Sequence, residues 1–142
     1  MTVAVASGKG GTGKTTIAVS LALSREEPGT LLDCDVEEPN AHLFLHPSIE
    51  EAHPVELLVP EVDTALCTGC GACSRACRFH AIVTLGTEAL VFPELCHACG
   101  GCTLACPTHA IREVPFRIGV VERGRAGALA FAQGRLDVGR AM

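Results

Sequence analysis

The chain has 142 residues, of which 48% are apolar and 19% charged, so it can build a packed core and does not resemble a disordered protein. The net charge is −5 without any basic cluster, which disfavours nucleic-acid binding. No apolar run approaches the roughly 20 residues that span a bilayer, and no signal peptide is recognisable at the start. We therefore expect a cytoplasmic protein without membrane insertion.

The first third of the chain has the pattern of a βαβ unit. An apolar run at 2–7 predicts a buried parallel strand, and glycines follow it directly. Residues 14–24 predict a helix with Ile17, Leu21 and Ala18 on one face. The run TLLDCD at 30–35 predicts a second buried strand, in which Cys34 is expected to be a packed core thiol.

The remaining chain alternates irregular segments with short strands. Residues 36–54 contain three prolines and predict an irregular connection with a helical turn near 41–45. Strands are expected at 55–60, in two pieces of 82–92 around a turn at Gly86, and as a pair at 116–124 and 128–139.

A cysteine-rich unit occurs twice, 29 residues apart, in CTGCGACSRACRFHAI (67–82) and CHACGGCTLACPTHAI (96–111). Each copy has the spacing Cys-x2-Cys-x2-Cys-x3-Cys, which is typical of bacterial ferredoxins that bind 4Fe-4S clusters. Nine cysteines in a chain without an export signal favour metal or redox chemistry over disulfides. The doubled motif therefore predicts two 4Fe-4S clusters.

In this spacing the fourth cysteine of each copy reaches the cluster of the other copy. The first cluster is therefore assigned to Cys67, Cys70, Cys73 and Cys106, and the second to Cys96, Cys99, Cys102 and Cys77. Ile82 and Ile111 are expected to supply an apolar shell, while Arg78 places a cation next to Cys77. Two four-thiolate zinc sites remain an alternative, although zinc proteins seldom use this tandem spacing. His80 and His109 are expected to be structural.

Residues 8–15, GKGGTGKT, match the P-loop pattern G-x-x-x-x-G-K-S/T between an expected strand and helix. Backbone N–H groups from 10 to 15 are expected to hold phosphates at the positive end of the helix. Lys14 is expected to reach the β- and γ-phosphates of ATP, the Thr15 hydroxyl to bind Mg²⁺, and Thr16 to contact the α-phosphate. The predicted nucleotide-binding residues are Gly8, Lys9, Gly10, Gly11, Thr12, Gly13, Lys14, Thr15 and Thr16.

Lys9 gives the variant form K-G-G-x-G-K-T, which resembles the MinD/ParA-like P-loop ATPases, including the nitrogenase iron protein and the Mrp-type iron–sulfur carriers. The resemblance implies a homodimer of the full-length protein in which Lys9 reaches the partner's phosphates. It also implies that Asp35 positions the attacking water and that Asp33 helps to hold the Mg²⁺ shell. Lys9, Lys14 and Asp35 are thus the candidate catalytic residues, although two acids that simply end a strand remain an alternative for the aspartates.

The order of the motifs resembles the 4Fe-4S-containing MinD-superfamily ATPases of bacteria and archaea. This resemblance implies an α/β fold in which a partial parallel sheet of P-loop NTPase type carries an inserted α+β two-cluster ferredoxin-like domain. The expected limits are 1–61 for the first part of the ATPase domain, 62–115 for the insert and 116–142 for the return. No Walker B strand is recognisable after residue 112, so we expect either an N-terminal part of a longer ATPase or a natural truncation, which in both cases hydrolyses ATP poorly by itself.

These features lead to three functional hypotheses. The first is an ATP-binding iron–sulfur protein in which nucleotide gates electron transfer through two clusters, to or from a redox partner protein that the sequence does not identify. The second is an ATPase that serves as a scaffold or carrier for iron–sulfur clusters. The third is a simple ferredoxin with a vestigial nucleotide site, which the retained Lys9, Lys14, Thr15, Asp33 and Asp35 disfavour.

Overall fold

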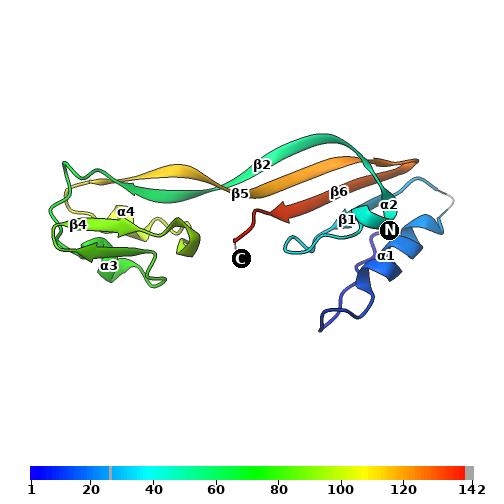
Figure 1. Cartoon of the computed structure of the whole chain (residues 1–142), viewed down its shortest axis with the longest axis horizontal. Helices are drawn as coiled ribbons and strands as arrows, with labels where there is room; N and C mark the ends of the chain where they lie inside the picture. The colour runs from blue at the N-terminus through cyan, green and yellow to red at the C-terminus, as the bar shows by residue number, and fades with distance from the viewer. Residues whose placement is uncertain (26, 140–142) are drawn as a thin grey trace. The chain divides into compact units, whose positions relative to one another are not determined.

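The computed structural model describes residues 1–25 and 27–139, and the chain divides into two compact units. Unit 1 consists of Met1–Val55 and Gly119–Val138, and unit 2 is built from Glu56–Ile118. Figure 1 colours the chain by residue number, so both units can be followed along the sequence. The expected domain limits at 61 and 116 stay predictions, because compactness alone does not define a domain.

The four-stranded sheet is mixed rather than parallel as expected. The four strands have the order β1-β6-β5-β2, where β1 is Thr30–Asp33, β6 Leu129–Leu136, β5 Ile111–Ala126 and β2 Ser48–Val62. The strands β2 and β5 contain residues of both units. β1 pairs with β6 in parallel, whereas β5 and β6 form an antiparallel hairpin. The expected strand pair near the C-terminus is therefore confirmed. It makes the sheet mixed, because a tight hairpin can only join antiparallel strands.

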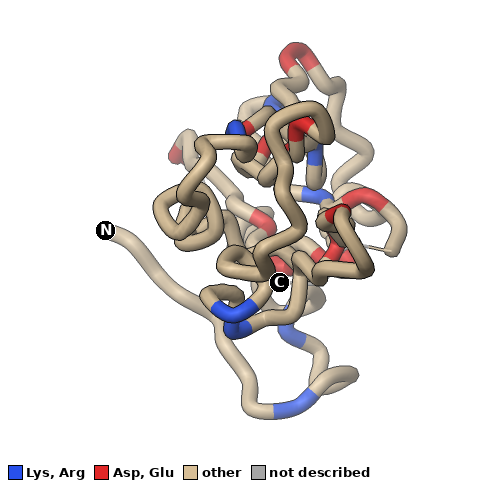
Figure 2. Tube along the Cα trace, turned by 90° about the vertical axis from the view of Figure 1, so that its left-hand side faces the viewer, with Lys and Arg blue, Asp and Glu red and all other residues tan. Residues whose placement is uncertain are grey.

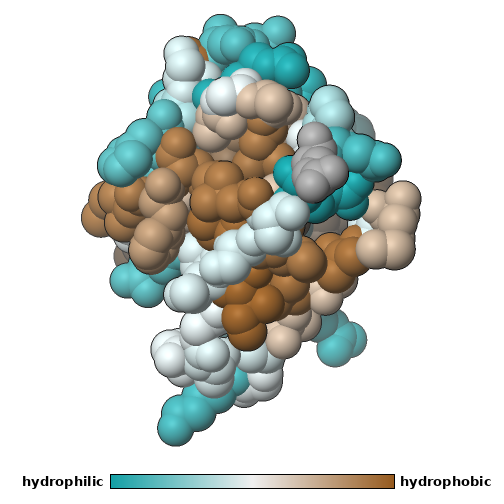
Figure 3. Space-filling view, turned by 90° about the vertical axis from the view of Figure 1, so that its right-hand side faces the viewer, coloured by the Kyte–Doolittle hydropathy of each residue, from teal (hydrophilic) through white to brown (hydrophobic). Residues whose placement is uncertain are grey.

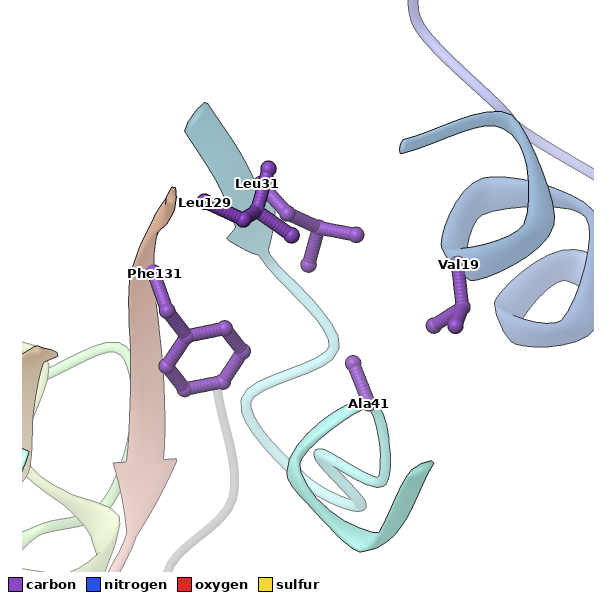
Figure 4. Close-up of a cluster of buried hydrophobic side chains, with 5 residues drawn as sticks. All are labelled: Val19, Leu31, Ala41, Leu129 and Phe131. Atoms are coloured by element: carbon purple, nitrogen blue, oxygen red, sulfur yellow. The ribbon is translucent and has the colours of Figure 1, made fainter. Parts of the chain in front are cut away.

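The core of unit 1 lies between the sheet and the two helices α1 (Lys14–Leu23) and α2 (His42–Leu45). Figure 4 shows its five buried side chains, which are Val19, Leu31, Ala41, Leu129 and Phe131. α1 therefore buries Val19 and not the predicted face, since Ile17 is 58% exposed and Leu21 44% exposed. The helix was predicted correctly, whereas the buried face differs from the apolar face seen in the sequence, because KTTIAVSLAL carries apolar residues on more than one face.

Three further expectations for unit 1 are wrong. Residues 2–7 form no strand, because a strand needs a hydrogen-bonded neighbour and none of the described strands pairs with them. Cys34 is exposed instead of packed, since β1 ends at Asp33. The segment 48–54 belongs to β2 and is not irregular. The helical turn near 41–45 is confirmed as α2.

Unit 2 contains two short helices, α3 (Ala72–Ala76) and α4 (Gly101–Ala105), and a hairpin of β3 (Ile82–Leu85) and β4 (Glu88–Val91). The hairpin turns at Gly86, whose φ of 61° supports the predicted turn. A 3-10 turn, η1 (Pro93–Leu95), precedes the second cysteine repeat. Ile82 and Ile111 are 1% and 6% exposed and belong to one apolar cluster with Cys73, whereas their role as a shell around iron–sulfur clusters stays a prediction.

The surface carries charges of both signs and a considerable amount of apolar area. Figure 2 shows positions of Lys and Arg interspersed with Asp and Glu along the trace. Figure 3 shows apolar residues gathered on the face that it draws. The exposed apolar side chains of α1 and α2 are Ile17, Leu21, Leu23, Leu43 and Phe44. Over 1–25 and 27–139, no helix is both long and apolar enough to span a membrane.

Candidate functional site

The eight cysteines of the repeat line two separate cavities in unit 2, four in each. The first cavity, with about 320 Å³ of empty space, is lined by Cys67, Cys70, Cys73 and Cys106. The second cavity, with about 380 Å³, is lined by Cys77, Cys96, Cys99 and Cys102. Each cavity thus combines three cysteines of one repeat with the fourth cysteine of the other. Within the described part of the chain, no three Cys, His, Asp or Glu side chains converge as they would around a single metal ion.

The backbone around the cavities turns in the same way in both repeats. Gly71 and Gly100, which precede α3 and α4, have φ values of 72° and 70° in the left-handed region that suits glycine. His80 and His109 also have positive φ values, 53° and 51°, and neither lines a cavity. The residue directly after each histidine, Ala81 or Ala110, donates its N–H to a cysteine sulfur.

Backbone N–H groups donate to three of the cysteine sulfurs. Ala81 N donates to Cys77 Sγ at 3.3 Å, and Ala110 N donates to Cys106 Sγ at the same distance. Ala98 N lies 3.4 Å from Cys96 Sγ. Such hydrogen bonds stabilise a thiolate and help to set the potential of a bound iron–sulfur cluster. The loops therefore hold these three cysteine sulfurs with backbone hydrogen bonds already formed.

Two of the thiols have pKa values that depart from the ordinary value in opposite directions. Burial raises the pKa of Cys102. Burial has the same effect on Cys106, but hydrogen bonds from Thr108 and from the Ala110 backbone outweigh it and lower the pKa of that thiol. The hydrogen bonds at Cys106 therefore favour its thiolate, the form in which a cysteine binds metal, whereas burial disfavours the thiolate of Cys102.

One glycine of the first repeat is required by packing as well as by conformation. Gly69 has a φ of 67°, and a methyl group added to it would lie 2.6 Å from Thr87 Cα. The equivalent residue of the second repeat is Ala98, which has a φ of 50°. The two repeats therefore share a backbone conformation, but only the first is closely covered by the β3–β4 turn.

The glycine loop before α1 is open and exposed. Gly11 and Gly13 have φ values of 73° and 85°, and a methyl group added at either would meet no atom within 4 Å. α1 begins with no side-chain cap and no acidic residue in its first turn. The first N–H groups of a helix lack intrahelical partners, and its dipole attracts anions. The helix start therefore fits a phosphate group.

The two P-loop side chains expected to meet ATP and Mg²⁺ contact the segment after β1. Lys14 Nζ lies 4.0 Å from Asp35 Oδ2, and the Thr15 hydroxyl donates to Asn40 Oδ1 at 2.6 Å. Lys9 and Thr16 are exposed. The structure therefore brings Lys14 close to Asp35, while it places Thr15 next to Asn40, a residue that the sequence analysis did not select.

Asp33 holds the same segment in place through its side chain. Its Oδ1 accepts from the N–H of Asp35 at 3.1 Å, and its Oδ2 accepts from the N–H groups of Asn40 and Ala41 at 3.1 and 3.0 Å. Both carboxylate oxygens are thus used within the chain, so the role of Asp33 toward Mg²⁺ stays a prediction. Asn40 could have been recognised only from its spacing to Asp33, a weak signal in a loop.

Comparison with known proteins gives two family matches. Residues 1–70 match the family ParA, described as NUBPL iron-transfer P-loop NTPase, and residues 66–111 match Fer4_9, described as a 4Fe-4S dicluster domain. The chain combines a ParA-like P-loop NTPase region with a 4Fe-4S dicluster region. It is therefore an iron–sulfur protein with a nucleotide-binding, ATP-binding region, as the sequence motifs predicted.

A curated relative covers part of the chain. An uncharacterized protein of Methanocaldococcus jannaschii is 38% identical over 86 residues, which amount to 58% of this chain and 30% of the relative. The chain thus spans less than a third of the length of that relative.

Proposed function

We propose that this chain binds two 4Fe-4S clusters, one in each cysteine-lined cavity, and that Mg-ATP at the P-loop gates electron transfer through them. The observation that carries the proposal is the division of eight cysteines into two sets of four, each drawn from both repeats. The residues that would hold the first cluster are Cys67, Cys70, Cys73 and Cys106, and those for the second are Cys96, Cys99, Cys102 and Cys77. The clusters supply reversible one-electron chemistry when bound.

The cavities fit such a group in three respects. Each offers four thiols, the number that a 4Fe-4S cluster needs. Backbone N–H groups already point at Cys77, Cys96 and Cys106. The apolar residues Ile82 and Ile111 lie against the cysteine cluster, which restricts water near the sulfurs.

Gating by nucleotide is supported by the contacts of Lys14 and Thr15. Both side chains currently engage the segment 33–41, through Asp35 and Asn40. A phosphate group competes with Asp35 for Lys14, and Mg²⁺ competes with Asn40 for the Thr15 oxygen. Nucleotide binding would therefore release this segment, which is the kind of order change that γ-phosphates control in P-loop proteins.

In the complete ATPase, Lys9 would serve a homodimer by reaching the partner's phosphates, and Asp35, once released from Lys14, would position the attacking water. Asp33 would remain the support of the released segment and a candidate for the Mg²⁺ shell. A redox partner protein would deliver or receive the electrons.

The test is anaerobic purification followed by counting of iron and sulfide and a visible spectrum, with and without Mg-ATP. We expect about eight irons and eight sulfides per chain, the content of two 4Fe-4S clusters. Zinc, or a colourless protein, would end the proposal. Clusters that are present but whose potential and partner reduction ignore Mg-ATP would remove the gating and leave an iron–sulfur protein.

The second candidate is an iron–sulfur carrier, which the printed description of the matching family as an iron-transfer NTPase favours. A carrier releases its clusters to an apo-acceptor, whereas an electron-transfer protein retains them. Incubation of the iron-loaded chain with an apo-ferredoxin and Mg-ATP distinguishes the two: transfer of iron supports the carrier, and full retention supports electron transfer.

A further inference from the structure

The two cysteine-lined cavities differ in charge at positions that the sequence repeat makes equivalent. A shift of 29 residues relates Gly71 to Gly100, and the same shift relates two nearby pairs of unlike side chains. Arg75 of the first repeat corresponds to Leu104 of the second, and Thr84 corresponds to Glu113. The two cavities can therefore be compared with each other, because their cysteine loops have similar backbone conformations but different charged neighbours.

At the first cavity the charged neighbour is a cation. Arg75 Nη1 donates to the carbonyl oxygen of Cys70 at 3.1 Å, and a methyl group added at Gly71 would lie 3.0 Å from the same nitrogen. Thr84 lines this cavity, and its hydroxyl oxygen is buried without a hydrogen-bond partner among the described residues. A hydroxyl hydrogen rotates freely, so it can donate to a sulfur placed in the cavity.

At the second cavity the charged neighbour is an anion. Glu113 lines the cavity, and a methyl group added at Gly100 would lie 3.3 Å from Glu113 Oε1. Leu104 takes the place of the arginine and is 89% exposed. Arg78, the cation singled out from the sequence, is exposed and, like Arg75, lines neither cavity, whereas Arg75 is bonded to the cavity-lining Cys70. The lining also includes His97, whose ring stacks on Phe79 at 3.9 Å.

We propose that Arg75 and Glu113 make the two cluster sites electrically unequal, so that the site of Cys67, Cys70, Cys73 and Cys106 accepts an electron at the higher potential. The inference rests on the proposed two-cluster function. Reduction adds one negative charge to a cluster, which a neighbouring guanidinium stabilises and a neighbouring carboxylate opposes. Net charge and hydrogen bonds to sulfur are the main protein influences on cluster potential, and Arg75, Thr84 and Glu113 provide both.

The repeat itself supplies the substitutions for the test. Arg75→Leu gives the first repeat the residue of the second, and Glu113→Thr gives the second repeat the residue of the first. The full chain is purified without oxygen, its iron and sulfide are counted, and its clusters are titrated with dithionite while EPR follows reduction. We expect two resolved midpoint potentials in the original protein. Arg75→Leu should lower only the higher one, and Glu113→Thr should raise only the lower one.

A charge-preserving and an isosteric variant control for structural damage. Arg75→Lys keeps the cation and should lower the higher potential less than Arg75→Leu does. Glu113→Gln removes the charge at nearly unchanged size and should raise the lower potential as Glu113→Thr does. If the original protein holds eight irons but both clusters titrate together, or the variants shift the potentials in the opposite direction, the inference is wrong. A protein without iron overturns the proposed function instead.

Discussion

In the cysteine-lined cavities the backbone has already adopted the turns that place the thiols. In the glycine loop, by contrast, the side chains that are expected to bind nucleotide contact the segment 33–41 instead. Gly71 and Gly100 adopt left-handed conformations at the same point of each repeat, and N–H groups reach Cys77 and Cys106. Lys14 and Thr15, by contrast, contact Asp35 and Asn40. The difference suggests that the cysteine-lined cavities hold a permanently bound group, whereas the glycine loop binds a group that exchanges.

The largest effect is expected from removing a thiol at a prebuilt cavity. Cys73 is buried and lines the first cavity, so Cys73→Ser should remove about half of the iron, one cluster of two. Iron and sulfide per chain are the measurement, and far-UV circular dichroism shows whether the fold persists. Cys34→Ser at the exposed thiol after β1 is the matched control and should retain all the iron. Full iron in the Cys73 variant would mean that the cavity is not a ligand site.

The next effect tests whether the turns of the cavities depend on glycine. Gly69→Ala places a methyl group against Thr87 and forces alanine into a left-handed backbone. Strain and overlap together should lower the free energy of unfolding by about 2–4 kcal/mol. Denaturant unfolding under anaerobic conditions measures it.

The equivalent change in the other repeat is the control. Ala98 already occupies a left-handed conformation with a φ of 50°. Ala98→Gly should change the free energy of unfolding by about 1 kcal/mol or less, because relief of strain offsets the added freedom of the unfolded chain. If Gly69→Ala and Ala98→Gly changed the free energy of unfolding equally, the β3–β4 turn would not restrict the first repeat.

The sequence predicted some features because they depend on spacing alone. The spacing of the cysteines predicts which four of them line each cavity, although the metal and its ligands stay predictions. The P-loop pattern specifies the start of α1 because glycines and Lys14 must follow one another directly. Ile82 and Ile111 were recognisable because an apolar residue closes both repeats.

Other features depend on which segments fold together, and the sequence could not supply them. α1 is apolar on several faces, so the burial of Val19 instead of Ile17 follows from where β1 and β6 lie. Asn40 is seven residues from Asp33 and comes next to Thr15 only through the turn that Asp33 holds. Glu113 lies outside the cysteine motif and reaches the second cavity because β5 returns past it.

A smaller effect concerns the polar network of the sheet in unit 1. Gln133 Nε2 donates to Glu122 Oε2 at 2.6 Å, and Arg135 lies 3.3 Å from the other oxygen. The Gln133 hydrogen bond lowers the pKa of Glu122, burial opposes it, and Arg135 lowers the pKa further. The Glu122 carboxylate therefore binds a proton more weakly in the folded state than in the unfolded state. Its contribution to the free energy of unfolding is complete above the unfolded-state pKa and is lost as the pH falls through the folded-state pKa.

Glu122→Gln should accordingly reduce stability by about 1 kcal/mol at neutral pH and have no such cost at acidic pH, where the carboxylate is protonated. Unfolding by urea across this range, with the clusters' absorbance recorded separately, measures the difference between variant and original protein. Glu88→Gln at an exposed position of β4 is the control. A constant deficit at every pH would assign the loss to packing and not to charge.

The smallest effect is expected at the glycine loop, where nucleotide has to displace a contact within the chain. Asn40→Ala removes the oxygen that accepts the Thr15 hydrogen bond but retains the backbone N–H that Asp33 binds. If nucleotide must displace this contact, its loss should tighten Mg-ATP binding by about 2–10-fold, since one hydrogen bond contributes about 0.5–1.5 kcal/mol. Calorimetry measures the affinity, and Ser24→Ala at the far end of α1, which loses only a bond to Leu21, should leave it unchanged. Weaker binding in the Asn40 variant would instead make Asn40 part of the nucleotide-bound site, and the segment 33–41 would then be a support that ATP retains.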